Sequence, residues 1–198
     1  MGIYEFAGCV VSYEPLYGLL RRRMETYRSD TERQPDITLD GTKEDYEKLR
    51  KQYPHLSIEE CEYSCAGAEF YMKLLKHQGF MIHASAVEKE GKAYLFSAPS
   101  GTGKSTHAQL WRQTFKGEPI RIINDDKPAV CLQNGVFYAC GTPFSGKTDK
   151  NENRKAPIQG LCMLHRGKTN KIQKITSGEA LPLILPQTLF YGDEEETN

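Results

Sequence analysis

The stretch that most constrains the fold is AYLFSAPSGTGKSTHAQLWRQTF, residues 93–115. The apolar run AYLF predicts a strand, and the glycines after it predict a tight turn. The segment from Ser105 to Phe115 predicts a helix, because Ala108, Trp111 and Phe115 fall on one helical face. His107 is expected to lie on the face of this helix without a chemical role. A strand, a glycine-rich turn and a helix in direct succession indicate an α/β protein.

The turn carries the residue types of a phosphate-binding loop. In such a loop the glycines let backbone N–H groups face phosphates, a lysine reaches the terminal phosphates, and a serine holds Mg²⁺. The helix that follows presents its positive end to the anion. We predict ATP and Mg²⁺ as cofactors, with Ser105 as a metal ligand. The predicted nucleotide-binding residues are Ser100, Gly101, Thr102, Gly103, Lys104, Ser105 and Thr106.

Ala98 stands where this loop pattern has its first glycine. An alanine is tolerated there if its φ angle stays negative, because only a positive φ strongly favours glycine. A glycine-rich turn that binds nothing is the alternative interpretation of the whole stretch.

A second set of polar residues follows the strand IRIINDD, residues 120–126. A phosphate-binding loop needs a carboxylate from another strand end to complete the Mg²⁺ shell. Asp125 and Asp126 supply two, so one can bind the metal and the other can accept a proton. A simple Asx turn before Pro128 is the alternative.

The remaining pattern predicts strands and helices on both sides of this motif. In chain order we expect a strand at 3–12, a helix from Pro15, a short strand ITL, helices at 43–52 and 57–75, strands at 80–87 and 92–97 joined by a turn at 88–91, a hairpin at 129–140 with an Asn134-Gly135 turn, a strand at 158–166, and a helix capped by Thr176 and Glu179. Residues 1–78 are predicted to form an N-terminal α+β section packed on a core of residues 79–198. The acidic end GDEEETN is expected to be solvated.

Composition restricts the partners and the compartment. Lysine plus arginine and aspartate plus glutamate number 26 each, so no global field favours nucleic acid or an anionic membrane. The start of the chain lacks a signal-peptide pattern, and no segment approaches the roughly 20 apolar residues of a membrane span. The six cysteines contain no CxxC pair and are predicted to be reduced, in a cytoplasmic protein. Cys61 and Cys65 could share a metal, but a buried helix face is the favoured interpretation.

HASAVEKEGKAYLFSAPSGTGKST and INDDKPAV resemble the catalytic domain of HPr kinase/phosphorylase and its relatives. That P-loop fold is shared with ATP-dependent PEP carboxykinase, and the likeness covers residues 79–165. The resemblance implies a mixed α/β sheet, with His83 and the aspartate pair in the site. It implies that Lys104 binds ATP, that Asp125 is the base, that Asp126 binds the metal, and that His83 orients a carboxylate. The two aspartates could exchange these roles, and a satisfied core histidine is the alternative for His83.

Within this group, the likeness extends to HPr kinase-related proteins of peptide-maturation clusters. Their basic loop is matched by residues 141–157, which makes Lys147, Asn151 and Arg154 candidate phosphate or acceptor contacts. A plain surface loop is the alternative. The loop motif for the reverse, phosphorolytic reaction is not found, and residues 1–78 do not resemble the family's N-terminal domain. Related chains run past residue 198, so part of the acceptor site is expected to lie beyond it.

These observations together predict an ATP- and Mg²⁺-dependent kinase for a hydroxyl, in particular a serine, of a protein or peptide. A small-molecule kinase, a PEP carboxykinase-like phosphotransferase and an inactive nucleotide-sensing module are the alternatives. The identity of the acceptor and the formation of a homo-oligomer stay open.

Overall fold

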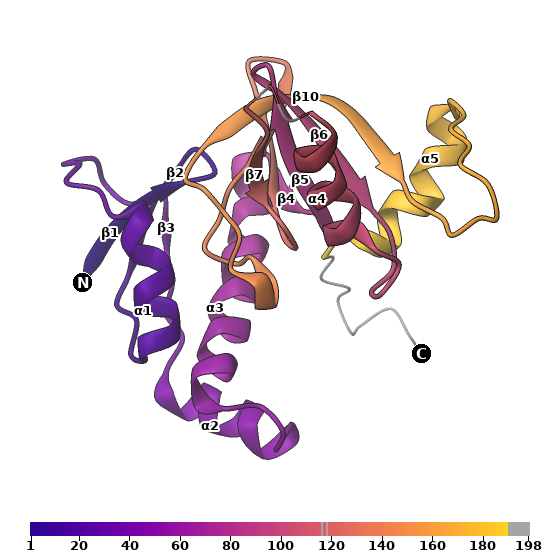
Figure 1. Cartoon of the computed structure of the whole chain (residues 1–198). Helices are drawn as coiled ribbons and strands as arrows, with labels where there is room; N and C mark the ends of the chain where they lie inside the picture. Colours follow the sequence, from indigo (N-terminus) through magenta and orange to yellow (C-terminus); the bar gives the residue numbers. More distant parts are fainter. Residues whose placement is uncertain (116, 118, 190–198) are drawn as a thin grey trace.

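A computed structural model describes residues 1–115, 117 and 119–189, and it has a mixed α/β fold. A curled seven-stranded mixed sheet lies beside a three-stranded sheet and a group of N-terminal helices (Figure 1). The strands are β1 (Gly2–Phe6), β2 (Cys9–Tyr13), β3 (Ile37–Thr38), β4 (Gly79–Met81), β5 (Ala84–Lys89), β6 (Lys92–Ser97), β7 (Arg121–Asn124), β8 (Ala129–Gln133), β9 (Val136–Cys140) and β10 (Lys155–Met163). The α-helices are α1 (Gly18–Met24), α2 (Lys43–Gln52), α3 (Ile58–Leu74), α4 (Lys104–Thr114) and α5 (Ser177–Ile184).

The single strand predicted over residues 3–12 is wrong. The segment is a hairpin of β1 and β2, and its turn places Ala7 at φ 53° and Gly8 at φ 80°. Helix α1 also begins later than the predicted Pro15. The backbone N–H groups of Leu16 and Tyr17 donate instead to the buried carboxylate of Glu62, which holds this segment outside the helix.

Helices α2, α3 and α5 confirm their predictions. Each begins with a capping box, in which a Thr or Ser side chain and an acidic side chain satisfy each other's backbone N–H groups. The Asn134-Gly135 turn is also confirmed, since both residues have positive φ angles between β8 and β9. Strand β10 begins at Lys155, earlier than the predicted residue 158.

The seven-stranded sheet has the order β4-β8-β9-β10-β6-β5-β7. The run of residues 79–97 forms three strands where two were predicted, because β4 pairs with β8 while β5 pairs with β6 and β7. His83 lies at the break between β4 and β5. Since β5 is antiparallel to both neighbours, the carboxyl ends of β6 and β7 meet at one edge of the sheet, with the start of β5 between them.

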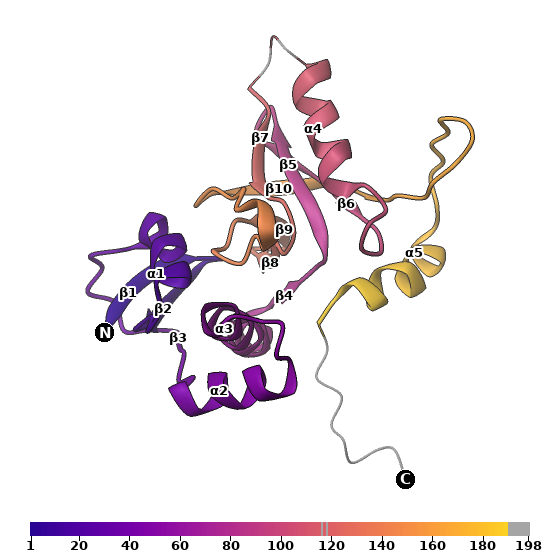
Figure 2. The same ribbon diagram turned by 60° about the horizontal axis from the view of Figure 1, so that its bottom comes forward.

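Two layers of apolar side chains hold helices against this sheet. Trp111 of α4 packs on Tyr94 and Phe96 of β6, with ring centroids 5.0 and 5.2 Å apart. Figure 2 shows α4 and α3 on opposite sides of the sheet. On the α3 side, Phe144 stacks against Phe70 in a core that also contains residues of β1, β2, β8 and β9.

The division of the chain at residue 78 stays a prediction. The acidic end, residues 192–198, lies outside the described residues. Among the helices of residues 1–115, 117 and 119–189, none has the length and apolar character of a transmembrane helix.

Candidate functional site

The glycine-rich loop leaves β6 and enters α4, as the sequence predicts. Gly101 and Gly103 have φ angles of 76° and 118°, in the region that favours glycine. A Cβ atom added to either would meet no atom within 4 Å. The loop backbone is therefore open at both glycines, and its N–H groups lie at the N-terminus of an eleven-residue helix.

Lys104 is the first residue of α4 and is only 7% exposed. Its Nζ donates to the carbonyl oxygen of Ala98 at 2.9 Å, across the loop. Burial lowers the pKa of Lys104, while the charges of Asp126 and Asp125 act in the opposite direction. The ammonium group of Lys104 thus interacts electrostatically with both carboxylates of the predicted site.

Ala98 is fully buried, and its φ angle is not positive. This confirms that alanine is accommodated at the strand end without left-handed backbone. His107 lies on the surface of α4, as expected, and it also packs on the sheet, because its ring centroid is 4.4 Å from that of Phe96. Burial lowers the pKa of His107.

Asp125 is the more buried member of the aspartate pair, with 2% of its surface exposed. Ser85 donates to Oδ1 at 2.8 Å, and Thr148 donates to Oδ2 at 3.0 Å. Both hydroxyl groups were missed at the level of sequence. Ser85 looks like an ordinary small strand residue, and Thr148 approaches from a loop that is distant along the chain.

Asp126 has a different environment, with 28% of its side chain exposed. Oδ1 lies 3.3 Å from Nε2 of His83, and Oδ2 lies 3.1 Å from Nζ of Lys127. Burial raises the pKa of Asp126, but the hydrogen bond from His83 and the charge of Lys127 outweigh it and lower the pKa to about 2. Asp126 is therefore an ionised and accessible carboxylate.

The sheet explains why these groups meet. The loop follows β6, the aspartates follow β7, and His83 precedes β5 between them. Ser97 at the end of β6 donates through Oγ to the carbonyl of His83 at 2.9 Å, and Ala84 N–H donates to the carbonyl of Asp126 at 3.1 Å. His83, Lys104 and the aspartate pair therefore share one edge.

The predicted basic loop is brought to this edge in part. Lys147 lies in a short 3₁₀ turn, Gly146–Thr148, directly beside the aspartates, and its side chain is exposed. Asn151 pairs with Asn124 through an isolated bridge just before Asp125. This loop therefore joins the candidate site along residues 145–151.

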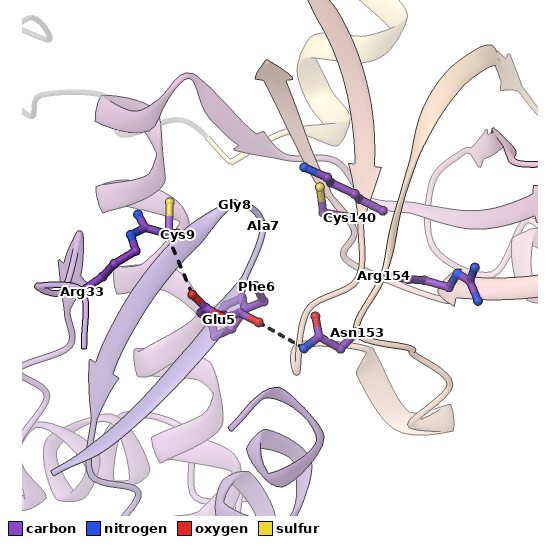
Figure 3. A pocket seen from close by; sticks show the side chains of 10 residues that line it. Glu5, Phe6, Ala7, Gly8, Cys9, Arg33, Cys140, Asn153 and Arg154 are labelled. Carbon is purple, nitrogen blue, oxygen red and sulfur yellow. Dashed lines mark hydrogen bonds and ion pairs between the residues drawn. The ribbon is translucent and has the colours of Figure 1, made fainter. Parts of the chain in front are cut away.

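Arg154 is not brought to the glycine-rich loop. Its Nε lies 2.7 Å from Oε2 of Glu88, at the end of β5 opposite His83. Arg154 also lines a cavity of about 410 Å³ between the β1–β2 turn and the start of β10. Figure 3 shows its side chain extending away from the labelled N-terminal residues Glu5, Cys9 and Arg33.

A second cavity, of about 590 Å³, lies between β10 and α5 and is lined by residues of 161–184. Neither cavity is lined by the glycine-rich loop or by the aspartate pair. The chemistry at the sheet edge, and not cavity size, is what marks the candidate site.

Within the described part of the chain, no group of three or more His, Cys, Asp or Glu residues is arranged to hold a metal ion. Mg²⁺, however, is usually held by one or two carboxylates together with substrate phosphates. An ionised, accessible Asp126 and the Ser105 hydroxyl at the start of α4 fit that pattern. Cys61 is buried and Cys65 half-buried, as a helix face predicts.

Comparisons with known proteins do not assign a family. No protein-family model matches this chain, and no curated protein matches it at a significant level. Among solved structures, it is similar to the HPr(Ser) kinase/phosphatase from Coxiella burnetii, with 13% identity and a TM-score of 0.34. The match covers 48% of this chain and 65% of the other, less than two thirds of that protein. A TM-score this low does not assign a fold family or a function to the chain.

Proposed function

We propose that this protein binds ATP with Mg²⁺ at residues 98–106 and transfers the γ-phosphate to a hydroxyl group of a peptide or protein, in particular a serine. The observation that carries the proposal is the shared sheet edge. There, an open glycine-rich loop and Lys104 at a helix N-terminus lie together with an ionised, accessible aspartate. Phosphoryl transfer needs this combination of phosphate binding and charge neutralisation.

In this proposal the backbone N–H groups of the loop and the Lys104 ammonium bind the phosphates. Lys104 exchanges its hydrogen bond to the Ala98 carbonyl for bonds to phosphate oxygens, which are stronger because both partners are charged. Mg²⁺, held by Ser105 and Asp126, neutralises charge on the phosphate chain when it is bound.

The two aspartates are proposed to differ in access. Asp126 is the carboxylate that can meet the metal and an incoming hydroxyl, because it is partly exposed. Asp125, which the resemblance makes the base, is buried and already accepts two hydroxyl hydrogen bonds. We therefore propose a different role for it, in which it supports the edge and holds Thr148 next to it. His83 orients Asp126 and not Asp125.

The proposed compartment is the cytoplasm. All six cysteines are free thiols, which supports a reducing environment.

Thermal unfolding with Mg-ATP tests nucleotide binding. A ligand at 100 times its Kd stabilises a protein by about 2.7 kcal/mol. The unchanged protein should show a matching rise in Tm, and Lys104→Ala should lose most of it. Lys92→Ala, an exposed lysine at the other end of β6, is the matched control and should respond like the unchanged protein. Equal responses in all three proteins would contradict a phosphate site at this loop.

Transfer is tested separately with γ-labelled ATP and serine-containing peptides and small proteins from the source cell, followed by mapping of the labelled residue. Label on a serine or threonine hydroxyl is the expected result. Nucleotide binding without any transfer would favour the sensing module, and label on a small molecule would favour a metabolite kinase.

A further inference from the structure

The loop of residues 145–151 lies between the aspartate pair and the N-terminal section. Figures 1 and 2 show its 3₁₀ turn, in orange, next to α3. It begins directly after Phe144, which is buried in the aromatic core. The loop contacts the aspartate pair on one side and residues of the N-terminal section on the other.

On one side the loop packs against the aspartates. Gly146 has a φ angle of 69°, and a Cβ atom there would lie 2.7 Å from Oδ2 of Asp126. Thr148 donates to Asp125, and the N–H of Asp125 donates to the carbonyl of Lys150 at 3.0 Å. A displacement of this loop would therefore move groups that touch both carboxylates.

On the other side, residues of the N-terminal section form hydrogen bonds with the backbone of Gly146. The N–H of Gly146 donates to the Tyr63 hydroxyl at 3.0 Å, and Nη2 of Arg23 donates to the Gly146 carbonyl at 2.7 Å. The Arg23 guanidinium also lies 4.9 Å from the Tyr63 ring centre, and its Nε lies 3.1 Å from Asp149. Both polar groups of Gly146 are thus held by residues more than eighty positions away.

The Arg23 side chain is only 9% exposed. A buried guanidinium needs partners in fixed directions, because its donors form a rigid planar fork. Here the partners are the loop backbone and Asp149, while the neighbouring Arg21 and Arg22 are exposed. Arg23 is therefore committed to this loop, unlike the rest of its Arg-Arg-Arg run.

We infer that Arg23 and Tyr63 are positioning residues, through which the N-terminal section holds loop 145–151, and with it Lys147 and Thr148, against the aspartate pair. The inference rests on the proposed function for its effect on transfer. It gives the N-terminal section a part in the reaction, since misplacing a positioned group can cost on the order of 10²-fold in rate.

Hydrogen exchange followed by mass spectrometry tests, without an activity assay, whether Arg23 and Tyr63 hold loop 145–151 in place. Arg23→Ala should speed exchange in peptides covering residues 145–151, Arg23→Lys should restore part of the protection, and Arg22→Ala should exchange like the unchanged protein. Tyr63→Phe, which removes only the hydroxyl group, should speed exchange of the Gly146 amide. Unchanged exchange in Arg23→Ala and Tyr63→Phe would overturn the inference.

ATP turnover, measured as labelled phosphate released to water or to the serine peptides, tests the effect on transfer. Arg23→Ala should lower kcat by about 10-fold or more while the KM for Mg-ATP and the Mg-ATP rise in Tm stay unchanged. Faster loop exchange with unchanged kcat would overturn the positioning role. Arg23 would then stabilise the loop without affecting transfer. Two results would instead count against the proposed function, and so against the positioning role. One is a Lys104→Ala variant that keeps the full Mg-ATP rise in Tm, and the other is no ATP turnover in the unchanged protein.

Discussion

His83 and Asp126 form a pair at the edge of the sheet, with Nε2 of His83 3.3 Å from Oδ1 of Asp126. The backbone of His83 is held on both sides, because its backbone N–H donates to the Gln187 carbonyl and its backbone carbonyl accepts from the Ser97 hydroxyl. The segment after α5 therefore helps to orient the histidine that supports the accessible carboxylate.

Removing this imidazole should change the ionisation of Asp126. The pKa of about 2 depends on the hydrogen bond from His83, so His83→Ala should move it toward the usual Asp value of about 3.9. A carboxyl NMR titration measures this shift, and His165→Ala, an exposed histidine, is the control. Because the folded pKa is lowered, Asp126 adds stability above pH ~3.9 that is lost as the pH falls toward 2. His83→Ala should shrink that pH dependence, and an unmoved Asp126 titration would show that Lys127 alone sets it.

The two aspartates should respond differently to neutralisation. Asp126→Asn should weaken Mg-ATP binding and lower transfer by about 10²-fold or more, because the phosphates would lose the carboxylate that positions Mg²⁺, and misplacing a reacting group can cost on the order of 10²-fold in rate. Asp125→Asn should keep Mg-ATP affinity and lose less transfer, at a stability cost of about 1 kcal/mol, since both hydroxyl partners can rotate. Calorimetric titration and labelled-ATP assays measure the two effects. A larger transfer loss in Asp125→Asn would assign the base to Asp125.

Restoring the glycine of the loop pattern should be mild. Ala98→Gly should lower stability by about 1 kcal/mol, from the added backbone freedom, and leave Mg-ATP affinity within a few-fold. Ala93→Gly, at an equally buried position at the other end of β6, should cost the same and leave the ATP response unchanged. Urea unfolding and Mg-ATP titrations compare them, and a large gain in affinity for Ala98→Gly alone would show that alanine impairs the loop.

Gly146→Ala should destabilise more than a comparable turn substitution. Gly135 has a similar positive φ angle, 77°, but a Cβ there would meet no atom within 4 Å. Gly135→Ala should therefore cost only the left-handed backbone penalty of about 1–2 kcal/mol. Gly146→Ala adds the close approach to Asp126 and should cost more, with altered Mg-ATP binding. Equal losses in urea unfolding would mean that the loop simply shifts away from Asp126.

The sequence predicted those elements whose turn or capping residues lie close together along the chain. The Asn134-Gly135 turn and the capping boxes at Ser57 and Thr176 depend on residues within four positions, so they were visible in the sequence. The β1–β2 turn was not, because Ala7 takes a positive φ angle that alanine rarely adopts. The break at His83 has no glycine or proline, and it arises only because β4 and β5 pair with different strands.

The candidate site divides in the same way. Lys104 and the aspartate pair were predicted from a contiguous motif and a strand end. Arg23 and Tyr63 could not be, since their partner at Gly146 lies 123 and 83 residues further along the chain. Arg154 has the residue type of a phosphate contact, but in the structure it forms an ion pair with Glu88, at the end of β5 opposite His83.

Phe144 has a consequence for how this protein can be divided or changed. Its ring contacts Phe6, Tyr63, Phe70 and Tyr71, all from the first 78 residues, and the loop of the candidate site starts at the next residue. A shortened protein starting at residue 79 would leave this ring in water and the loop without its anchor. Residues 79–189 are thus not expected to fold unchanged without the first 78 residues, and a different N-terminal section would have to supply new aromatic contacts for Phe144.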